Sequence, residues 1–586
     1  MLLEVMAAEC GKTLDQGDPE VSEAIDFANY YATLAEQLDT VDGAVAVPVG
    51  LTVVTPPWNF PVAIPTGSVL AALAAGSPVI IKPATQARRC GSVMVQALWD
   101  AGVPADVLQL VHVDERDLGT RLVSDDRVSR LILTGAFETA ALFRSFRPDL
   151  PLLAETSGKN AIVITPHADL DLAVKDLVYS AFGHAGQKCS AASLGILVGS
   201  VARSARFRDQ LVDAVSSLKV GYPSDPTVQM GPIIEPAAGK LLRALTQLAP
   251  GEQWLVAPRR LDDTGRLWSP GVKTGVRRGS EFHLTEYFGP VLGLIAADDL
   301  DDAIAIQNEV DYGLTAGLHS LDRDEIEHWI DRVQAGNAYV NRSTVGAIVR
   351  RQPFGGWKKS AVGAGAKAGG PNYLFGLCDW RSAPAAQAGE IGPAVRRILD
   401  AAQHFALEPE ELDFLRRSFA SDALAWAQEF GVARDVSGLM AETNVFRYLP
   451  LPVTVRAEHE DTAALMRVVG AGILAGSAVT VSTPIPLDPA IVEALEGAGV
   501  TCRVHDAAAW SNVLRDNAPA RVRLLGGRRE EFAHASDGRV DIALYAQPVV
   551  EAGRIELLTF LREQAVAVTA HRFGSPTPLA EGLFRD

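Results

Sequence analysis

Cys189 lies in a segment whose composition suits a nucleophile. The chain there reads Phe182-Gly-His-Ala-Gly-Gln-Lys-Cys-Ser190, and small residues let backbone N–H groups approach a thiolate. A single cysteine is more often a small buried hydrophobe. The role of Cys189 therefore depends on the other reactive groups that accompany it.

Three further segments carry groups that could assist a thiol. Thr55-Pro-Pro-Trp-Asn-Phe-Pro61 is either a proline-rich turn or the source of an oxyanion donor, Asn59; losing such a donor typically costs ~3 kcal/mol of transition-state stabilisation. Leu153-Ala-Glu-Thr-Ser-Gly-Lys-Asn160 offers Glu155, which is either a solvated strand end or a base that activates water. Lys82 follows a predicted strand at the edge where doubly wound sheets bind ligands.

The elements that would position these groups alternate along the first 380 residues. Short apolar runs fit strands covered on both faces, and helix-like stretches separate them. This alternation predicts an α/β fold with a parallel, doubly wound sheet. The predicted strands cover residues 79–81, 107–111, 131–133 and 161–164, and the predicted helices cover 90–100 and 119–123. The apolar run 62–81 is broken by proline and glycine, which predicts a helix and a buried strand rather than a membrane span.

The chain continues into a second region that echoes the first. The segment 75–83 can be laid over 475–483, and the pieces beginning at Ala101 and Leu131 recur in order at Ala498 and Arg523. A repeat in the same order predicts a duplicated, degenerate copy of the nucleotide-binding fold. We expect a cofactor domain (1–157), a catalytic domain (158–380), a linker (381–393), a helical connector (394–450) and a degenerate Rossmann-like domain without catalytic residues (451–586).

Charge and cysteine usage limit the function classes. The formal net charge of −18 argues against a nucleic-acid partner. The five cysteines are far apart and form no CxxC pair, so we expect neither a disulfide framework nor a metal site. The first residues lack the pattern of a signal peptide. These features together favour a cytoplasmic protein.

The four segments, in this order, resemble the aldehyde dehydrogenase superfamily. Further similar segments are Glu286-Tyr-Phe-Gly-Pro290 and Pro353-Phe-Gly-Gly356, and the resemblance covers residues 4–380. It implies an NAD-dependent enzyme in which Cys189 attacks an aldehyde, Asn59 holds the oxyanion and Glu155 activates water to hydrolyse a thioester. It also implies a set of cofactor-binding residues: Lys82 and Glu286 on the two riboses, Phe288 on the nicotinamide ring, and Gly135, Pro57 and Trp58 nearby.

A narrower resemblance concerns the substrate. The segments 339–342, 346–357 and 367–374 are similar to pyrroline-5-carboxylate dehydrogenases, above all to those fused in bifunctional proline utilisation A proteins. This implies oxidation of L-glutamate γ-semialdehyde to L-glutamate. The substrate carboxylate would be held by Ser190, Gly369 and Gly370, while Phe182 and Phe354 would flank its aliphatic chain. The resemblance also implies a flavin-dependent proline dehydrogenase, either as a separate partner or as a fused upstream domain.

Departures from these families leave alternatives open. Thr85 stands where many relatives carry a ribose-binding glutamate, and Ser482 replaces Lys82 in the second domain. The chain starts almost at the segment 9–12, so it is either a shortened protein or a fragment of a fusion. The alternatives are an inactive fragment, a scaffold, or an aldehyde dehydrogenase of another substrate; a homo-oligomer is left open. We expect the second domain to bind no nucleotide and to cover the substrate mouth of the first, burying at least ~1,000 Å².

Overall fold

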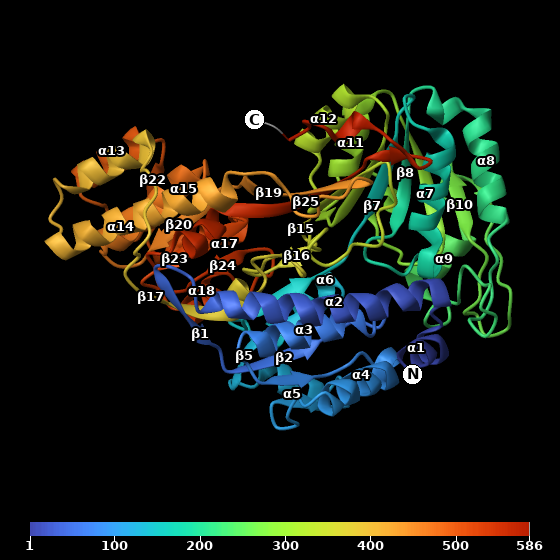
Figure 1. Cartoon of the computed structure of the whole chain (residues 1–586), viewed down its shortest axis with the longest axis horizontal. Coiled ribbons are helices and arrows are strands. Elements are labelled where there is room, and N and C mark those ends of the chain that lie inside the picture. Colours follow the sequence, from blue (N-terminus) through green and yellow to red (C-terminus); the bar gives the residue numbers. More distant parts are fainter. Residues whose placement is uncertain (585–586) are drawn as a thin grey trace.

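The computed structural model describes residues 1–584, which form an N-terminal nucleotide-type domain, a catalytic domain and a second nucleotide-type domain (Figure 1). The first sheet has the order β16-β6-β5-β2-β3-β4. Its strands are β2 (Leu51–Thr55), β3 (Val79–Ile81), β4 (Leu108–Leu110), β5 (Val128–Thr134), β6 (Leu152–Glu155) and β16 (Ala361–Val362). The helices around it are α1 (Leu2–Cys10), α2 (Leu14–Leu38), α3 (Ala63–Ala74), α4 (Arg88–Asp100), α5 (Leu118–Ser124) and α6 (Phe137–Phe146). The predicted strands and helices of this region are confirmed within a few residues.

The catalytic domain is built on a ten-stranded sheet of order β18-β19-β25-β14-β13-β7-β8-β11-β10-β9. Its strands are β7 (Asn160–Ile164), β8 (Ala192–Val198), β9 (Gln253–Val256), β10 (Gly271–Thr274), β11 (Val291–Ala297), β13 (Thr315–His319), β14 (Asn337–Val340), β18 (Arg434–Asp435), β19 (Glu442–Pro450) and β25 (Leu561–Thr569). The helices that cover it include α7 (Leu170–Phe182), α8 (Ala205–Ser216), α11 (Leu300–Asn308) and α12 (Arg323–Arg332). The strands β7, β8, β11, β13 and β14 are almost entirely buried apolar runs, as expected of a parallel sheet covered on both faces.

The second nucleotide-type domain repeats the topology of the first. Its sheet has the order β22-β21-β20-β23-β24, which matches β4-β3-β2-β5-β6 strand for strand, and all its pairs are parallel. The strands are β20 (Val453–Ala457), β21 (Val479–Thr483), β22 (Thr501–Val504), β23 (Arg521–Leu525) and β24 (Ala543–Tyr545). The helices are α15 (Thr462–Leu474), α16 (Pro489–Gly497), α17 (Ala507–Asp516), α18 (Arg529–Ala535) and α19 (Gly553–Glu556). The predicted degenerate α/β copy is confirmed as a fold.

Two long strands connect this domain to the catalytic sheet. The chain of the second domain continues into β25, which pairs antiparallel with β19 and parallel with β14. In Figure 1 both strands run from the second domain on the left toward the catalytic domain on the right. The predicted helical connector over residues 394–450 therefore differs from the structure in its last part. Helices α13 (Pro393–Ala402) and α14 (Pro409–Ala425), with a π-turn to Phe430, give way to β18 and β19, because residues 444–448 are rich in β-branched and aromatic side chains.

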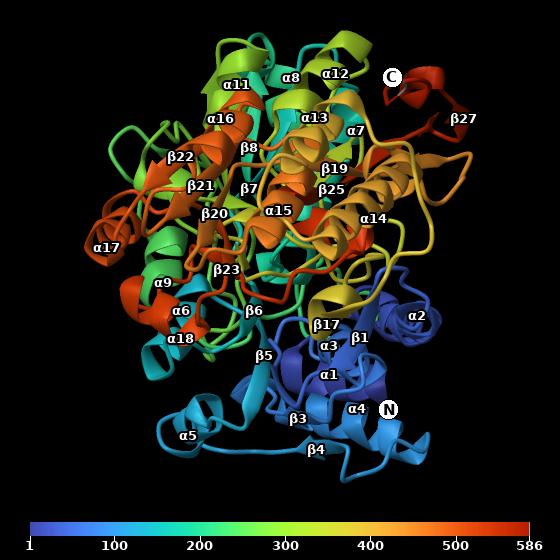
Figure 2. The same ribbon diagram turned by 90° about the vertical axis from the view of Figure 1, so that its left-hand side faces the viewer.

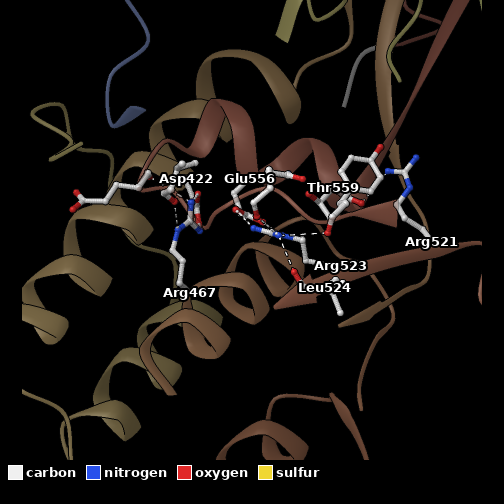
Figure 3. A network of polar contacts seen from close by, with 11 residues as sticks. Asp422, Arg467, Arg521, Arg523, Leu524, Glu556 and Thr559 are labelled. Atoms are coloured by element: carbon white, nitrogen blue, oxygen red, sulfur yellow. Dashed lines mark hydrogen bonds and ion pairs between the residues drawn. The ribbon is translucent and has the colours of Figure 1, made fainter. Parts of the chain in front are cut away.

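Buried ion pairs stabilise the second domain. Arg467 of α15 donates two hydrogen bonds to Asp422 of α14, at 2.7 and 2.9 Å. Arg523 of β23 donates two to Glu556 of α19, at 2.7 and 3.2 Å. All four side chains are fully buried (Figure 3). Because a buried charge without its partner is strongly destabilising, the Asp422–Arg467 pair fixes the domain to the connector helix α14, and the other pair holds β23 against α19 within the domain.

The second domain lies beside the active half of the chain. In Figure 2 its sheet faces the viewer, and the lower part of the picture shows β5 and β3 of the first domain. A cavity of about 1240 Å³ lies where the domains meet, and residues from both line it.

Within the described residues, no helix is long and apolar enough to cross a membrane.

Candidate active site

The nucleophile loop leaves α7 through an unusual backbone. His184 and Ala185 adopt positive φ angles of 53° and 54°, and Gly186 follows at 67°. This turn brings Cys189 in front of β8, where Asn160 Nδ2 donates to the Cys189 carbonyl at 2.7 Å. Cys189 is partly buried. Burial and the nearby carboxylates of Glu155 and Glu286 raise the pKa of the thiol to about 12, so the resting group is protonated.

A buried ion pair holds Asn59, the predicted oxyanion donor, in place. Asn59 is buried, and its carbonyl accepts a hydrogen bond from Lys12 Nζ at 2.9 Å. Lys12 in turn pairs with Glu20, whose other oxygen accepts from Val62 N at 2.7 Å. The ring of Phe60 lies between Lys12 and Lys188, at 4.3 and 6.0 Å from their Nζ atoms. The segment after β2 therefore contacts the nucleophile loop.

The sequence interpretation missed the charged residues around this contact. Lys12 and Glu20 come from the first two helices, and no local motif links them to Asn59. Lys188 precedes Cys189 and is buried, which lowers its pKa to about 7. Glu23 on α2 lies near enough to interact with it, and burial raises the pKa of Glu23 to about 8. The adjacency of Lys188 to the cysteine was the only signal in the sequence.

Glu155 occupies the last position of β6, as its motif predicted. Burial raises the pKa of Glu155 to about 7, while the Lys367 ammonium and the Ala368 N–H oppose that rise. A carboxylate whose pKa lies near neutrality is well matched to general-base work. The Glu155 side chain also lines the cavity between the domains, from which water can reach it.

The predicted cofactor residues fall into two groups. Lys82 Nζ, at the carboxyl end of β3, lies 3.2 Å from Glu115 Oε1, and Thr85 donates to the same oxygen at 3.3 Å. The second group gathers near Cys189: the Trp58 and Phe288 rings meet edge to face at 5.6 Å. Pro57 is partly exposed directly before Trp58.

Two further contacts link the cofactor residues to the catalytic ones. Glu286 Oε1 accepts from Gly158 N at 2.9 Å, and Gly135 N donates to the Glu155 carbonyl at 3.1 Å. Burial raises the pKa of Glu286, and the Gly158 N–H opposes this. An amine at a strand edge and a carboxylate beside an aromatic pair can hold the two ends of a dinucleotide.

The predicted substrate residues are only partly brought together. Ser190 and Phe182 are buried beside Cys189, and Phe354 pairs with Ala368 through both backbone groups. Gly369 N donates to Tyr31 Oη at 2.9 Å, and Gly370 N donates to the Lys367 carbonyl at 3.0 Å. Holding a substrate carboxylate through Gly369 and Gly370 would require both hydrogen bonds to break.

A different loop presents open backbone next to Ser190. Thr344 Oγ1 donates to the Ser190 carbonyl at 3.0 Å, and Gly346 follows two residues later at a φ of 81°. A Cβ atom at Gly346 would meet nothing within 4 Å. Over residues 1–584, the N–H groups of Gly346 and Ala347 have no intramolecular acceptor. This loop therefore has free donors where Gly369 and Gly370 do not.

A thiol near two carboxylates, a buried asparagine on an adjoining segment of the N-terminal domain, and a nucleotide-type sheet edge together suit aldehyde oxidation. The aldehyde dehydrogenase family profile matches residues 1–382, and the chain belongs to that family. A 1-pyrroline-5-carboxylate dehydrogenase of Geobacillus sp. (strain WCH70) is 36% identical over 392 residues, which cover 63% of this chain and 75% of that protein. Bifunctional protein PutA of Klebsiella aerogenes is 34% identical over 494 residues, 79% of this chain and 37% of that protein.

A solved structure is similar over nearly the full chain. Proline utilization A from Corynebacterium freiburgense matches with a TM-score of 0.87 and 47% identity. The match covers 98% of this chain and 55% of that one. The chain thus spans about half the length of that PutA, and the second nucleotide-type domain lies within the similarity.

Proposed function

We propose that this chain oxidises L-glutamate γ-semialdehyde to L-glutamate with NAD as the hydride acceptor. The observation that carries the proposal is the proximity of Cys189 to the carboxylates of Glu155 and Glu286, with buried Asn59 on the segment that contacts the nucleophile loop. The names of its relatives, 1-pyrroline-5-carboxylate dehydrogenase and PutA, support the substrate. A flavin-dependent proline dehydrogenase, fused or separate, would supply it.

The chain's own groups account for both halves of the reaction. Cys189 Sγ releases its proton to water and forms a bond to the aldehyde carbon, and the carbonyl oxygen becomes an oxyanion. The Asn59 amide and the Cys189 N–H donate to that oxygen. Glu286, Phe288 and Trp58 would hold the nicotinamide end of NAD, which would supply the acceptor for the hydride of the same carbon and so leave a thioester. Glu155 then takes a proton from water, the hydroxyl bonds to the carbon, and the C–S bond breaks to release the carboxylate.

We further propose that the substrate carboxylate lies at Ser190. The Ser190 hydroxyl and the free N–H groups of Gly346 and Ala347 support this position more directly than Gly369 and Gly370, whose donors are engaged. Phe182 and Phe354 would flank the aliphatic chain. We expect the protein to work in the cytoplasm, since its five cysteines are free thiols.

Substrate comparison in the presence of NAD tests the proposal. Glutamate semialdehyde should exceed an uncharged aldehyde of similar length in kcat/KM by roughly ten- to hundredfold, because unpaired buried donors cost about 1–3 kcal/mol each. Cys189→Ala should abolish turnover and leave NAD binding intact, as measured by NADH absorbance and calorimetry. Equal efficiency toward both aldehydes would remove the substrate assignment, and no turnover of either would favour the inactive scaffold.

A further inference from the structure

The segment Lys367–Asn372 is held by residues that come much later in the chain. Glu563, on β25, accepts from Lys367 N at 2.7 Å and from Asn372 Nδ2 at 2.6 Å. Asn372 Nδ2 also donates to Tyr448 Oη at 2.8 Å, and its Oδ1 accepts from Arg554 Nη1 at 2.9 Å. Asn372 is fully buried. Its amide is thus occupied entirely by the strand pair and helix that belong to the second half of the molecule.

The other side of this segment faces the general base. Lys367 Nζ is buried and donates to Asn337 Oδ1 at 2.9 Å and to the Gly355 carbonyl. Lys367, Glu563 and Glu155 all line the same cavity. The segment therefore interacts with two carboxylates, Glu563 through a hydrogen bond to Lys367 N and Glu155 through the Lys367 charge and the Ala368 N–H.

We propose that Glu563 is a positioning residue for the Glu155 base, acting through the backbone and the ammonium group of Lys367. The proposal rests on the proposed function and deepens it, since it gives the strand β25 a part in thioester hydrolysis. Without Glu563, the two hydrogen bonds that it accepts at the ends of the segment are lost. The positive charge of Lys367, which interacts with Glu155, also loses its neighbouring carboxylate.

The charges around Lys367 determine the direction in which the pKa of Glu155 should move when Glu563 is replaced. Burial lowers the pKa of Lys367 to about 7, and the carboxylates of Glu563 and Glu155 oppose that change. Removing the Glu563 charge lowers the pKa of Lys367 further, so less of it is protonated near neutral pH. Glu155 then loses part of its counter-charge and its own pKa rises. The titratable groups that face these three are Cys189, Tyr30, Tyr31, Tyr373, Arg554, Tyr448 and Tyr545.

The pH dependence of thioester hydrolysis tests whether Glu563 acts on Glu155 through Lys367. Hydrolysis requires ionised Glu155, so its rate rises with pH through the pKa of that group. Glu563→Gln should move this acid limb upward by about one pH unit, a roughly tenfold loss of rate below the limb. Lys367→Met should move it in the same direction. The double variant should show no further shift, because both substitutions act on one charge.

A matched carboxylate serves as the control. Glu551 is buried, accepts from Arg417 and from Ala385 N, and contacts neither Lys367 nor Glu155. Glu551→Gln should lower thermal stability without moving the acid limb. A folded, NAD-binding Glu563→Gln variant with the wild-type acid limb would overturn the proposal, as would additive shifts in the double variant.

Hydrogen exchange gives a readout that needs no activity. The backbone amides of residues 367–370 and of Asn372 should exchange about tenfold faster in Glu563→Gln than in wild type, while those of helix α4 should not change. If wild type oxidises no aldehyde, the proposed function fails and the exchange rates still decide whether Glu563 holds the segment. Unchanged exchange would refute the positioning role even in an active enzyme.

Discussion

The two nucleotide-type sheets share their strand order and differ at their carboxyl edges. In the first sheet, Lys82 directly follows β3 and pairs with one carboxylate, that of the largely exposed Glu115. In the second sheet the corresponding strand β21 carries Ser482, and the neighbouring β20 carries Arg456. Topology is maintained by buried apolar strands, whereas ligand binding depends on a few side chains at the edge. A fold can therefore persist after its site has been lost.

Arg456 shows how the second edge is closed. Its guanidinium donates to both oxygens of Glu458 at 2.8 and 3.0 Å, and to Ser482 Oγ at 3.0 Å. It also donates to the His505 carbonyl at 2.8 Å and lies over the Trp510 ring at 5.0 Å. The side chain is 1% exposed. A cation already paired in this way fills the edge and offers little to a phosphate or a ribose.

The second domain instead packs against the rest of the chain and lines a cavity shared with it. Its strand β25 extends the catalytic sheet beside β14, and its residues line the cavity into which Glu155 opens. Neither Cys189 nor Ser190 is among the described residues that line this cavity, so the expectation that the domain covers the substrate site stays a prediction.

The largest effect should come from the chemistry of the first half. Glu155→Gln should lower steady-state turnover by roughly 10²–10⁴-fold, while the first turnover of NADH remains as a burst, since hydride transfer precedes hydrolysis. The pKa of Glu155 lies at about 7, so wild-type turnover should rise with pH through that value and the variant should not. Stopped-flow absorbance separates the two phases. An unchanged steady-state rate would assign the base to another residue.

A large effect on stability should come from the second half. Asp422→Asn leaves the fully buried Arg467 without its counter-charge (Figure 3), which should destabilise the domain by about 3–5 kcal/mol. Asp413, on the same helix, pairs with Arg416 at the surface, so Asp413→Asn should change little. Thermal unfolding followed by circular dichroism compares the two. Equal losses of stability would show that burial of the pair is not what matters.

The strand positions could be predicted from local sequence, and so could the candidate reactive residues, whose roles stay predictions. Cys189, Asn59 and Glu155 stand in local motifs, and the strand positions follow from apolar runs of three to seven residues. The contacts of Lys12 with Asn59 and of Tyr31 with Gly369 join residues far apart in sequence, and no local pattern encodes them. In the sequence alone, Gly369 and Gly370 therefore look like free donors. In the structure, the N–H groups of both residues already donate hydrogen bonds.

The repeat itself was visible because glycine turns and strands recur in the same order. The loss of an open ligand edge in the second domain was only partly predictable. The replacement of Lys82 by Ser482 is apparent in the sequence, whereas the burial of Arg456 depends on its contacts with Glu458 and His505. The strand β19 was missed because its pairing partner β25 lies more than a hundred residues later.

A moderate effect is expected on NAD affinity, in which substitutions at the carboxyl edges of the two sheets should differ. Lys82→Met should weaken NAD binding by roughly tenfold, the loss expected from one exposed-edge hydrogen bond to a ribose. Arg456→Met should leave both the affinity and the stoichiometry of one NAD per chain unchanged. Isothermal titration calorimetry measures both quantities. A second equivalent of NAD bound by wild type, and lost in Arg456→Met, would contradict the view that the second edge is closed.

The smallest effect concerns the choice between NAD and NADP. Thr85 lacks a carboxylate, but Glu115 reaches the same place from the loop after β4 and contacts both Lys82 and Thr85. A carboxylate there accepts a ribose hydroxyl and repels a 2′-phosphate. Glu115→Gln should therefore raise the NADP-to-NAD ratio of kcat/KM by a few fold, with most of the gain in KM for NADP.

The exposure of Glu115 supplies the control for that prediction. Its side chain is 64% exposed, so the repulsion should be screened and the difference between variant and wild type should shrink as salt is raised from 0.1 to 1 M, where the Debye length falls from about 10 to 3 Å. Asp106, exposed on the loop before β4, provides a matched charge removal: Asp106→Asn should leave the ratio unchanged. If both variants shift the ratio alike, the first edge selects its cofactor by net charge, and the contact of Glu115 with Lys82 and Thr85 has no specific role.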